Sequence, residues 1–223
     1  MRVLVFDVNE TLLDLAALDG PFEAVFGSAD VRREWFQQFL QSMLVSTITG
    51  PYVPFPRIAR AALDTTARRH CRTLGDADAK SILARVRELP PHPDARPALE
   101  RLRAAGFRLA TLTNSTAEVA EDQLKHAGIR ELFERVLSAD EVRRLKPAPE
   151  PYHMAAKALG VPVSQLRLIA AHAWDIAGAI RAGCAGAFVA REGRVPDELF
   201  TLPDVSGADL SSVADRIIAA DAT

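Results

Sequence analysis

The sequence predicts an α/β fold, a doubly wound parallel sheet with an all-α domain inserted after the first strand. Through most of the 223 residues, short apolar runs alternate with helix-like segments that stop at glycine. This alternation is typical of a doubly wound sheet. Residues 15–92 interrupt it, since they carry helical patterns and no convincing buried strand.

Five apolar runs rich in β-forming residues predict the strands. Residues 3–6 are apolar at every position, as expected of a strand covered on both faces, and the run ends at Asp7. The later strands are expected at residues 108–112, 136–138, 166–170 and 187–189. Helical patterns, each closed by a glycine, predict helices at residues 97–105, 117–127, 149–159 and 175–182, and the chain after Ser211 predicts a last helix.

The insertion contains three helical patterns separated by turn signals. They cover residues 30–48, 55–74 and 76–89, with proline and glycine clustered near residues 50–54, 75 and 90–93. We therefore predict a Rossmann-like core of residues 1–14 and 93–223 and a helical cap of residues 15–92.

The charge and composition exclude several classes of partner. Lys and Arg number 27 against 29 Asp and Glu, a net charge of -2, so we expect neither nucleic acid nor an anionic membrane as partner. The N-terminal apolar run is too short for a signal peptide, and no run approaches the ~20 residues of a membrane span. We expect a cytoplasmic protein that acts on a small molecule. The five histidines lack metal-ligand spacing, so no metal site is predicted.

Polar residues follow the predicted strands at the edge where α/β sheets bind ligands. Asp7 follows the first strand, Thr113 and Asn114 the second, and Asp175 the fourth, while Lys146 lies beyond the third. A carboxylate, hydroxyl and amide donors, a cation and a second carboxylate at one edge predict covalent catalysis with a nucleophilic aspartate.

Four motifs in this order resemble those of the haloacid dehalogenase superfamily: FDVNETL at residues 6–12, LTNS at 112–115, RLKP at 144–147 and AWD at 173–175. The helical insertion resembles that superfamily's cap. Trp174 before Asp175, and Lys146 six residues before Tyr152, are similar to the (S)-2-haloacid dehalogenase branch. The resemblance covers nearly the whole chain. It implies a hydrolase without cofactor, and dimerisation through the cap helices.

The resemblance assigns a role to each motif residue. Asp7 would displace halide from the carbon next to a substrate carboxylate, and water would then cleave the ester. Lys146 would hold Asp7 ionised, Thr113 and Asn114 would orient the substrate or Asp7, and Asp175 would position the water. Capping of a strand end by Thr113, and a first-turn helix acid at Asp175, are the alternatives.

Of these positions, Asn9 distinguishes best between phosphate-ester hydrolysis and carbon–halogen cleavage. Phosphatases of the superfamily carry a second Asp at this place, which protonates the leaving alkoxide. An amide cannot do this, and halide needs no proton to leave, so Asn9 favours carbon–halogen cleavage. A turn role for Asn9 is compatible with either.

Three further positions are assigned to substrate binding or its surroundings. Thr11 would hydrogen-bond the nucleophile loop or cap a helix. Tyr152 matches a family tyrosine near the lysine, with core packing as the alternative. Trp174 belongs to the final motif.

The chain departs from the family pattern at four places, one of which is Ala170, where a hydroxyl is lost. Phe36 stands where the dehalogenases carry an anion-binding arginine, and a neutral ring cannot replace a guanidinium. Arg33 lies one helical turn earlier and could reach the same face. His172 replaces an amide and could activate water, and Glu10 replaces a glycine.

The sequence therefore predicts hydrolytic dehalogenation of a short 2-haloalkanoic acid through an ester on Asp7. Two alternatives stay open: a magnesium-dependent phosphatase of the same superfamily, with Asp7 and Asp175 as ligands, and a weakened member that binds a ligand without turnover.

Overall fold

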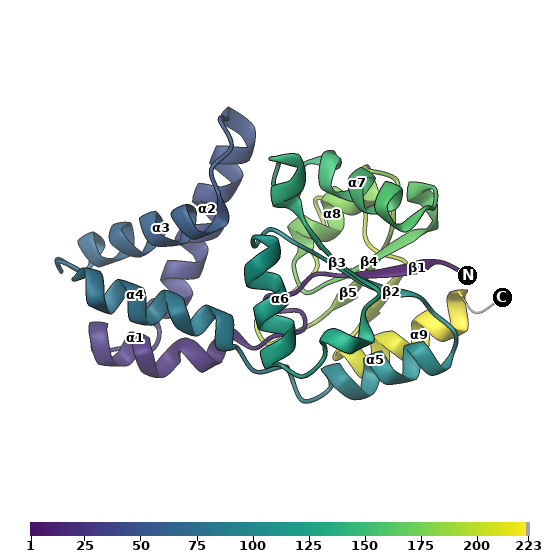
Figure 1. The fold of residues 1–223 in the computed structure, drawn as a ribbon, viewed down its shortest axis with the longest axis horizontal. Coiled ribbons are helices and arrows are strands. Elements are labelled where there is room, and N and C mark those ends of the chain that lie inside the picture. Colours follow the sequence, from purple (N-terminus) through teal and green to yellow (C-terminus); the bar gives the residue numbers. More distant parts are fainter. Residues whose placement is uncertain (222–223) are drawn as a thin grey trace.

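The fold is a six-stranded parallel sheet in the order β3-β2-β1-β4-β5-β6, covered by helices on both faces (Figure 1). The computed structural model describes residues 1–221. The strands are β1 (Val3–Phe6), β2 (Leu109–Thr113), β3 (Arg135–Ser138), β4 (Leu166–Ala170), β5 (Ala185–Val189) and β6 (Val205–Gly207). The predicted fold class is confirmed.

Alternation along β1 shows why the sheet needs two helical layers. Leu4 and Phe6 join one apolar cluster, and Val3 and Val5 join the other, because successive side chains of a strand point to opposite faces. All four are buried, so each face must be covered. The helices of the core are α5 (Ala95–Ala104), α6 (Ala117–His126), α7 (Pro149–Leu159), α8 (Ala173–Arg181) and α9 (Leu210–Asp221). In Figure 1, α7 and α8 lie on one side of the sheet and α5 and α9 on the other.

The insertion after β1 is helical, as predicted, and lies beside the sheet (Figure 1). Its helices are α1 (Asp19–Phe26), α2 (Val31–Thr49), α3 (Phe55–Arg69) and α4 (Asp76–Arg85). Short 3-10 helices are η1 (Leu15–Leu18), η2 (Val86–Glu88), η3 (Arg130–Leu132), η4 (Ala139–Val142) and η5 (Val163–Gln165). The chain segment that enters the insertion and the segment that leaves it lie side by side, since Asp14 N donates to Pro90 O at 2.9 Å.

Three elements differ from the prediction. The strand β6 was not predicted, because it has three residues and only Val205 is buried. The helix α1 was also not predicted, since its second and third residues are Gly20 and Pro21, a turn signal that the first turn of a helix tolerates. The helix α3 stops at Arg69 and not at residue 74, and Cys71 just beyond it has a left-handed φ of 53°.

Aromatic side chains form the core of the cap. Phe22 stacks on Phe26 with ring centroids 5.6 Å apart, and Trp35 lies 5.4 Å from Phe22. The indole Nε1 of Trp35 donates to Ala59 O at 3.1 Å and so ties α2 to α3. Among residues 1–221, no helix has the length and apolar character needed to cross a membrane.

Candidate active site

The carboxyl edge of the sheet gathers the polar residues predicted there. Asp7 follows β1, Asn114 follows β2, Lys146 lies in the loop beyond β3, and His172 follows β4. All four side chains are buried. Because parallel strands end at the same edge, residues separated by more than 160 positions meet here.

Asp7 is held by three donors from three segments. Its Oδ2 accepts from Thr11 Oγ1 at 2.8 Å and lies 3.2 Å from His172 Nδ1, and its Oδ1 accepts from Lys146 Nζ at 3.0 Å. Burial alone would raise the pKa of Asp7, but the charge of Lys146 and the contact with His172 outweigh it and hold the pKa well below its usual range. Asp7 is therefore an ionised, oriented carboxylate, as a nucleophile requires.

Lys146 has no free hydrogen. Its ammonium donates to Asp7, to Leu112 O at 2.8 Å and to Asp175 Oδ2 at 2.5 Å, which uses all three N–H groups. Burial lowers the pKa of Lys146, but the charges of Asp175 and Asp7 outweigh burial, so the pKa is raised above its usual value. Lys146 is thus a fixed cation, and it cannot also donate to a substrate carboxylate.

Asp175 lies behind Lys146. Both its carboxylate oxygens are used, Oδ2 by Lys146 and Oδ1 by the hydroxyl of Tyr152 at 2.6 Å, and the side chain is fully buried. Burial and the nearby charge of Asp7 raise the pKa of Asp175, and Lys146 opposes the shift. That Asp175 positions water stays a prediction. Its place is that of a support for Lys146.

Tyr152 is buried beside Asp175. Its ring packs in the core, and its hydroxyl donates to the Asp175 carboxylate, so the two alternatives given for Tyr152 are compatible. Gly178 of α8 makes room for it: a Cβ there would lie 2.7 Å from the Tyr152 hydroxyl and 2.5 Å from Pro147 Cβ. The missing side chain lets α8 approach the loop that carries Lys146.

His172 joins the nucleophile to a second carboxylate. Its Nδ1 faces Asp7, and its Nε2 lies 2.7 Å from Glu10 Oε2. Burial lowers the pKa of His172, but the hydrogen bonds and charges of Asp7 and Glu10 raise it to about 9. His172 is accordingly an imidazolium near neutral pH, donating to both carboxylates.

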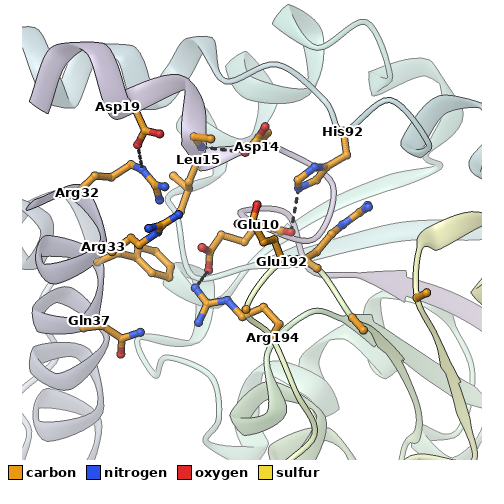
Figure 2. Close-up of a pocket in the computed structure, with 16 residues that line it drawn as sticks. Glu10, Asp14, Leu15, Asp19, Arg32, Arg33, Gln37, His92, Glu192 and Arg194 are labelled. Carbon is orange, nitrogen blue, oxygen red and sulfur yellow. Dashed lines mark hydrogen bonds and ion pairs between the residues drawn. The ribbon is translucent and has the colours of Figure 1, made fainter. Parts of the chain in front are cut away.

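Glu10 also forms an ion pair with Arg194 (Figure 2). Burial raises the pKa of Glu10, but His172 and Arg194 outweigh it and lower the pKa below its usual value. Glu10 has a left-handed φ of 61°, a conformation that glycine adopts without the cost a side chain incurs. This conformation is the reason a glycine suits this position in the family. In this chain Glu10 adopts it at some cost in backbone strain, and its carboxylate contacts His172.

Sequence reasoning missed Arg194. It lies in the loop after β5, and the rule that ligands bind at strand ends would have pointed to this loop had it been applied to the fifth strand.

The second strand's motif braces the site. Asn114 Oδ1 accepts from Lys146 N at 2.8 Å, and its Nδ2 donates to Lys146 O at 3.2 Å, which fixes the lysine backbone. Thr113 Oγ1 accepts from Ser115 N at 3.1 Å, a contact that corresponds to the alternative role of capping the strand end. Thr11 bonds Asp7, as expected, and also accepts from Ala171 N at 3.0 Å.

Asn9 is fixed at both ends of its amide. Its Oδ1 accepts from Gln123 Nε2 at 2.9 Å, and its Nδ2 donates to Ser115 Oγ at 3.3 Å. These bonds fix the orientation of the amide at the wall of the cavity over Asp7. An amide has no acidic proton, so Asn9 cannot serve as a general acid.

A small cavity of about 30 Å³ lies over the nucleophile. The rings of Phe36, His172 and Trp174 lie in a row along it, tilted by about 30° to one another, with centroids 6.0 Å apart for Phe36 and His172 and 5.2 Å apart for His172 and Trp174. The other lining residues are Asp7, Asn9, Phe39, Leu40, Met43, Phe55, Thr113 and Asn114. Most of the wall is thus apolar, which strengthens charge interactions at Asp7.

Arg33 is not brought to this cavity. Its side chain is 63% exposed and pairs with Asp30 at 3.0 Å. It lines a separate polar cavity of about 520 Å³, together with Glu10, Arg194 and Phe36 (Figure 2). Arg33 therefore lines the outer cavity and not the cavity over Asp7, and its role in place of the family arginine stays a prediction. Within residues 1–221, no group of three or more His, Cys, Asp or Glu side chains is arranged to hold a metal ion.

Known proteins share both this sequence and this fold. A family model described as haloacid dehalogenase-like hydrolase matches residues 1–183. The (S)-2-haloacid dehalogenase 2 of Pseudomonas sp. (strain CBS-3) is 31% identical over 214 residues, which cover 94% of this chain and 93% of that protein.

Two solved structures have the same architecture. The L-2-haloacid dehalogenase RSc1362 superposes with a TM-score of 0.92 at 29% identity, covering 97% of this chain and 98% of the other. The L-2-haloacid dehalogenase of Xanthobacter autotrophicus, solved with chloropropionic acid covalently bound, also has a TM-score of 0.92, at 22% identity and 99% coverage of each chain, and this likeness shows the fold. With the family model covering most of its length, the chain belongs to the haloacid dehalogenase-like hydrolases.

Proposed function

We propose that the protein hydrolyses the carbon–halogen bond of a short 2-haloalkanoic acid through an ester on Asp7. The observation that carries the proposal is an ionised Asp7 combined with Asn9, an amide that has no acidic proton, at the place of the phosphatases' second aspartate. The site has a nucleophile, and position 9 lacks the carboxylic acid that protonates an alkoxide leaving group in the superfamily's phosphatases. The names of the relatives, which are dehalogenases of this substrate class, support the same reaction.

In the first step, an oxygen of Asp7 attacks C2 of the substrate, and the halide leaves with the electron pair of the broken bond. Lys146 and Thr11 keep the carboxylate oriented through their bonds to Oδ1 and Oδ2. The attack needs no proton transfer.

In the second step, water attacks the carbonyl carbon of the Asp7 ester, and the 2-hydroxy acid leaves with Asp7 restored. The overall reaction consumes one water and releases one proton and one halide ion. His172 is the group that faces this carbon's oxygens, and its pKa is high partly because Asp7 is negative. Ester formation removes that charge, so the pKa of His172 falls and the ring releases its Nδ1 proton to solvent, which is the one proton the reaction releases. The neutral imidazole then accepts a proton from the attacking water and is an imidazolium again when Asp7 is restored. Glu10 holds the ring through Nε2.

We propose that the reaction needs no cofactor. The place between Asp7 and Asp175, where the phosphatase alternative would bind magnesium, is spanned by the ammonium of Lys146. Lys146 supplies there the positive charge that a metal would supply.

The test is halide and proton release from chloroacetate and 2-chloropropionate, with Asp7→Asn as control. We expect turnover that persists in EDTA and is lost in Asp7→Asn. Inactivity of the native protein on every short haloacid would reject the substrate class. Turnover of p-nitrophenyl phosphate that EDTA abolishes would favour the phosphatase, and saturable binding without turnover would favour the binding protein.

Two further predictions stay proposals. Dimerisation through the cap is supported by Val45 and Ile48, which are 53% and 81% exposed near the end of α2, and light scattering measures it. A cytoplasmic location is checked by fractionation.

A further inference from the structure

We propose that Arg194 binds the carboxylate of the substrate, on the side of the polar cavity that adjoins the nucleophile site. The inference rests on the proposed function and names the side chain that recognises the acid group of the 2-haloacid. Arg194 lies in the loop after β5, and none of the four sequence motifs includes it.

The two cations that touch Asp7 have no donor left for a second carboxylate. Lys146 uses its three N–H groups on two carboxylates and a backbone oxygen. His172 directs Nδ1 at Asp7 and Nε2 at Glu10. A 2-haloacid carries a full negative charge near neutral pH, and burying that charge is unfavourable unless a donor or cation meets it. The substrate therefore needs a further cation close to this site.

Arg194 is a cation with unused donors at the edge of the site. A guanidinium has five N–H groups, and within residues 1–221 that of Arg194 makes one hydrogen bond, from Nη2 to Glu10 (Figure 2). Its side chain is 22% exposed and lines the polar cavity. Arg191 of the same loop differs, because its three guanidinium nitrogens donate to Thr11 O and Asp94. Arg194 can therefore hold Glu10 and a second carboxylate at once.

Two contacts fix the guanidinium of Arg194. It lies over the Phe36 ring, with Cζ 5.8 Å from the ring centroid, and it pairs with Glu10. Glu10 is held in turn by His172, which contacts Asp7. The orientation of Arg194 is thus tied to that of the nucleophile, so little side-chain freedom remains to be lost when a carboxylate binds.

The ring of Phe36 marks the place where the polar cavity adjoins the nucleophile site. It lines the cavity of about 30 Å³ over Asp7 and the polar cavity of about 520 Å³ that contains Arg194. The small cavity holds roughly two water molecules, since one water needs about 10–15 Å³ of such volume. A 2-haloacid is larger, so with C2 at Asp7 part of it must extend beyond this cavity.

The other neighbouring cavity suits a carboxylate poorly. It has a volume of about 410 Å³ and shares the rings of Phe36, Phe39 and Phe55 with the small cavity over the nucleophile. A carboxylate moved to that aromatic wall would lose water and gain no hydrogen bond from it. The polar cavity with Arg194 is therefore the direction in which the acid group extends.

The kinetic test uses substitutions at position 194. Loss of one hydrogen bond between charged groups weakens binding about 10- to 100-fold. Arg194→Gln should raise KM for 2-chloropropionate by this factor and change kcat less. Arg194→Lys, which keeps the charge but loses the forked donors, should give an intermediate KM. Arg68→Gln, at an exposed position of α3 that lines none of these three cavities, is the matched control and should change neither constant.

Calorimetry measures recognition of the carboxylate without the reaction. Propionate and propionamide have nearly the same size, and only propionate is charged. The native protein should bind propionate about tenfold more tightly than propionamide, or better. Arg194→Gln should abolish this preference and leave the affinity for propionamide unchanged, whereas a merely structural role of Arg194 would weaken binding of both ligands.

The outcomes separate this inference from the proposed function. Unchanged KM and unchanged propionate affinity in Arg194→Gln would overturn the assignment. A loss of kcat alone would place the effect in the pair of Glu10 and His172, and Arg194 would then not bind the substrate. Loss of propionate binding in Arg33→Gln, with Arg194→Gln unaffected, would assign the carboxylate to Arg33 and overturn the proposal as well. Absence of halide release from every acid would reject the reaction, and calorimetry would still decide whether Arg194 binds a carboxylate.

Discussion

Removing His172 should change how stability depends on pH, and His172→Gln is the substitution that tests it. His172 is 4% exposed and lies between Asp7 and Glu10, with the rings of Phe36 and Trp174 on either side. Its pKa is raised from 6.5 to about 9 because the two carboxylates outweigh burial. The folded protein therefore binds this proton more tightly than the unfolded chain does.

The magnitude follows from this difference in proton affinity. Each tenfold change in proton affinity corresponds to about 1.4 kcal/mol. A pKa raised from 6.5 to about 9 therefore corresponds to about 3 kcal/mol of unfolding free energy. For a raised pKa, the contribution is fully present below pH 6.5 and is lost as the pH rises through 9. The native protein should lose this stability over that window, and His172→Gln should not.

Urea unfolding between pH 6 and pH 10 measures the effect in both proteins. The difference in unfolding free energy between native protein and variant should fall by about 3 kcal/mol across this range. His126→Gln, at an exposed position of α6, is the matched control. A difference that stays constant from pH 6 to pH 10 would refute the assignment of His172 as an imidazolium between two carboxylates.

Two further predictions concern packing and ion pairing. Gly178→Ala should destabilise the protein by about 1–3 kcal/mol and lower kcat, since the new Cβ would lie 2.5 Å from Pro147 Cβ. Thermal unfolding should show no such loss for Gly20→Ala, where no atom lies within 4 Å, and equal melting temperatures for the two variants would contradict the packing argument. Arg167→Ala should cost about 3–5 kcal/mol in urea unfolding without changing turnover, because it removes a buried guanidinium paired with Asp221 and Asp204. The buried Asp221 carboxylate is then left with Arg2 as its partner. Arg85→Ala, at an exposed ion pair, should cost less than about 1 kcal/mol. Equal losses of unfolding free energy in Arg167→Ala and Arg85→Ala would contradict the importance of burial for the Arg167 pair.

The sequence was most informative where local patterns decide the structure. The apolar run that ends at Asp7 predicted both a strand and the position of a carboxylate at its end, since both follow from adjacent residues. The same holds for Lys146 and His172, whose segments follow β3 and β4. The strand β6 could not be predicted, because its three residues pair with β5 only after the rest of the sheet exists.

The parts of the site that escaped prediction depend on loop conformation. Glu10 reaches His172 because its backbone adopts a left-handed φ, and residue type alone gives no reason to expect this of a glutamate. Arg194 reaches Glu10 across 184 positions of sequence, from a loop without a motif. The family resemblance assigned Asp175 to water, and nothing in the sequence indicated that Lys146 and Tyr152 both bind its carboxylate, because those contacts depend on how three segments pack together.

The absence of the cap arginine changes where the positive charge for the departing halide comes from. The core alone supplies three carboxylates, on Asp7, Glu10 and Asp175, and three cations, on Lys146, His172 and Arg194, so the resting cluster is neutral. Attack at C2 turns Asp7 into an uncharged ester, and the cluster then carries one positive charge at the moment when the halide becomes an anion. Negative charge thus moves from Asp7 to the halogen beside cations that are already fixed in place, which is the arrangement that lowers a barrier by electrostatic preorganisation. Phe36 lies over the His172 ring and keeps this region apolar. In the proposed reaction, the field of these core cations would stabilise the leaving halide in place of a cap arginine.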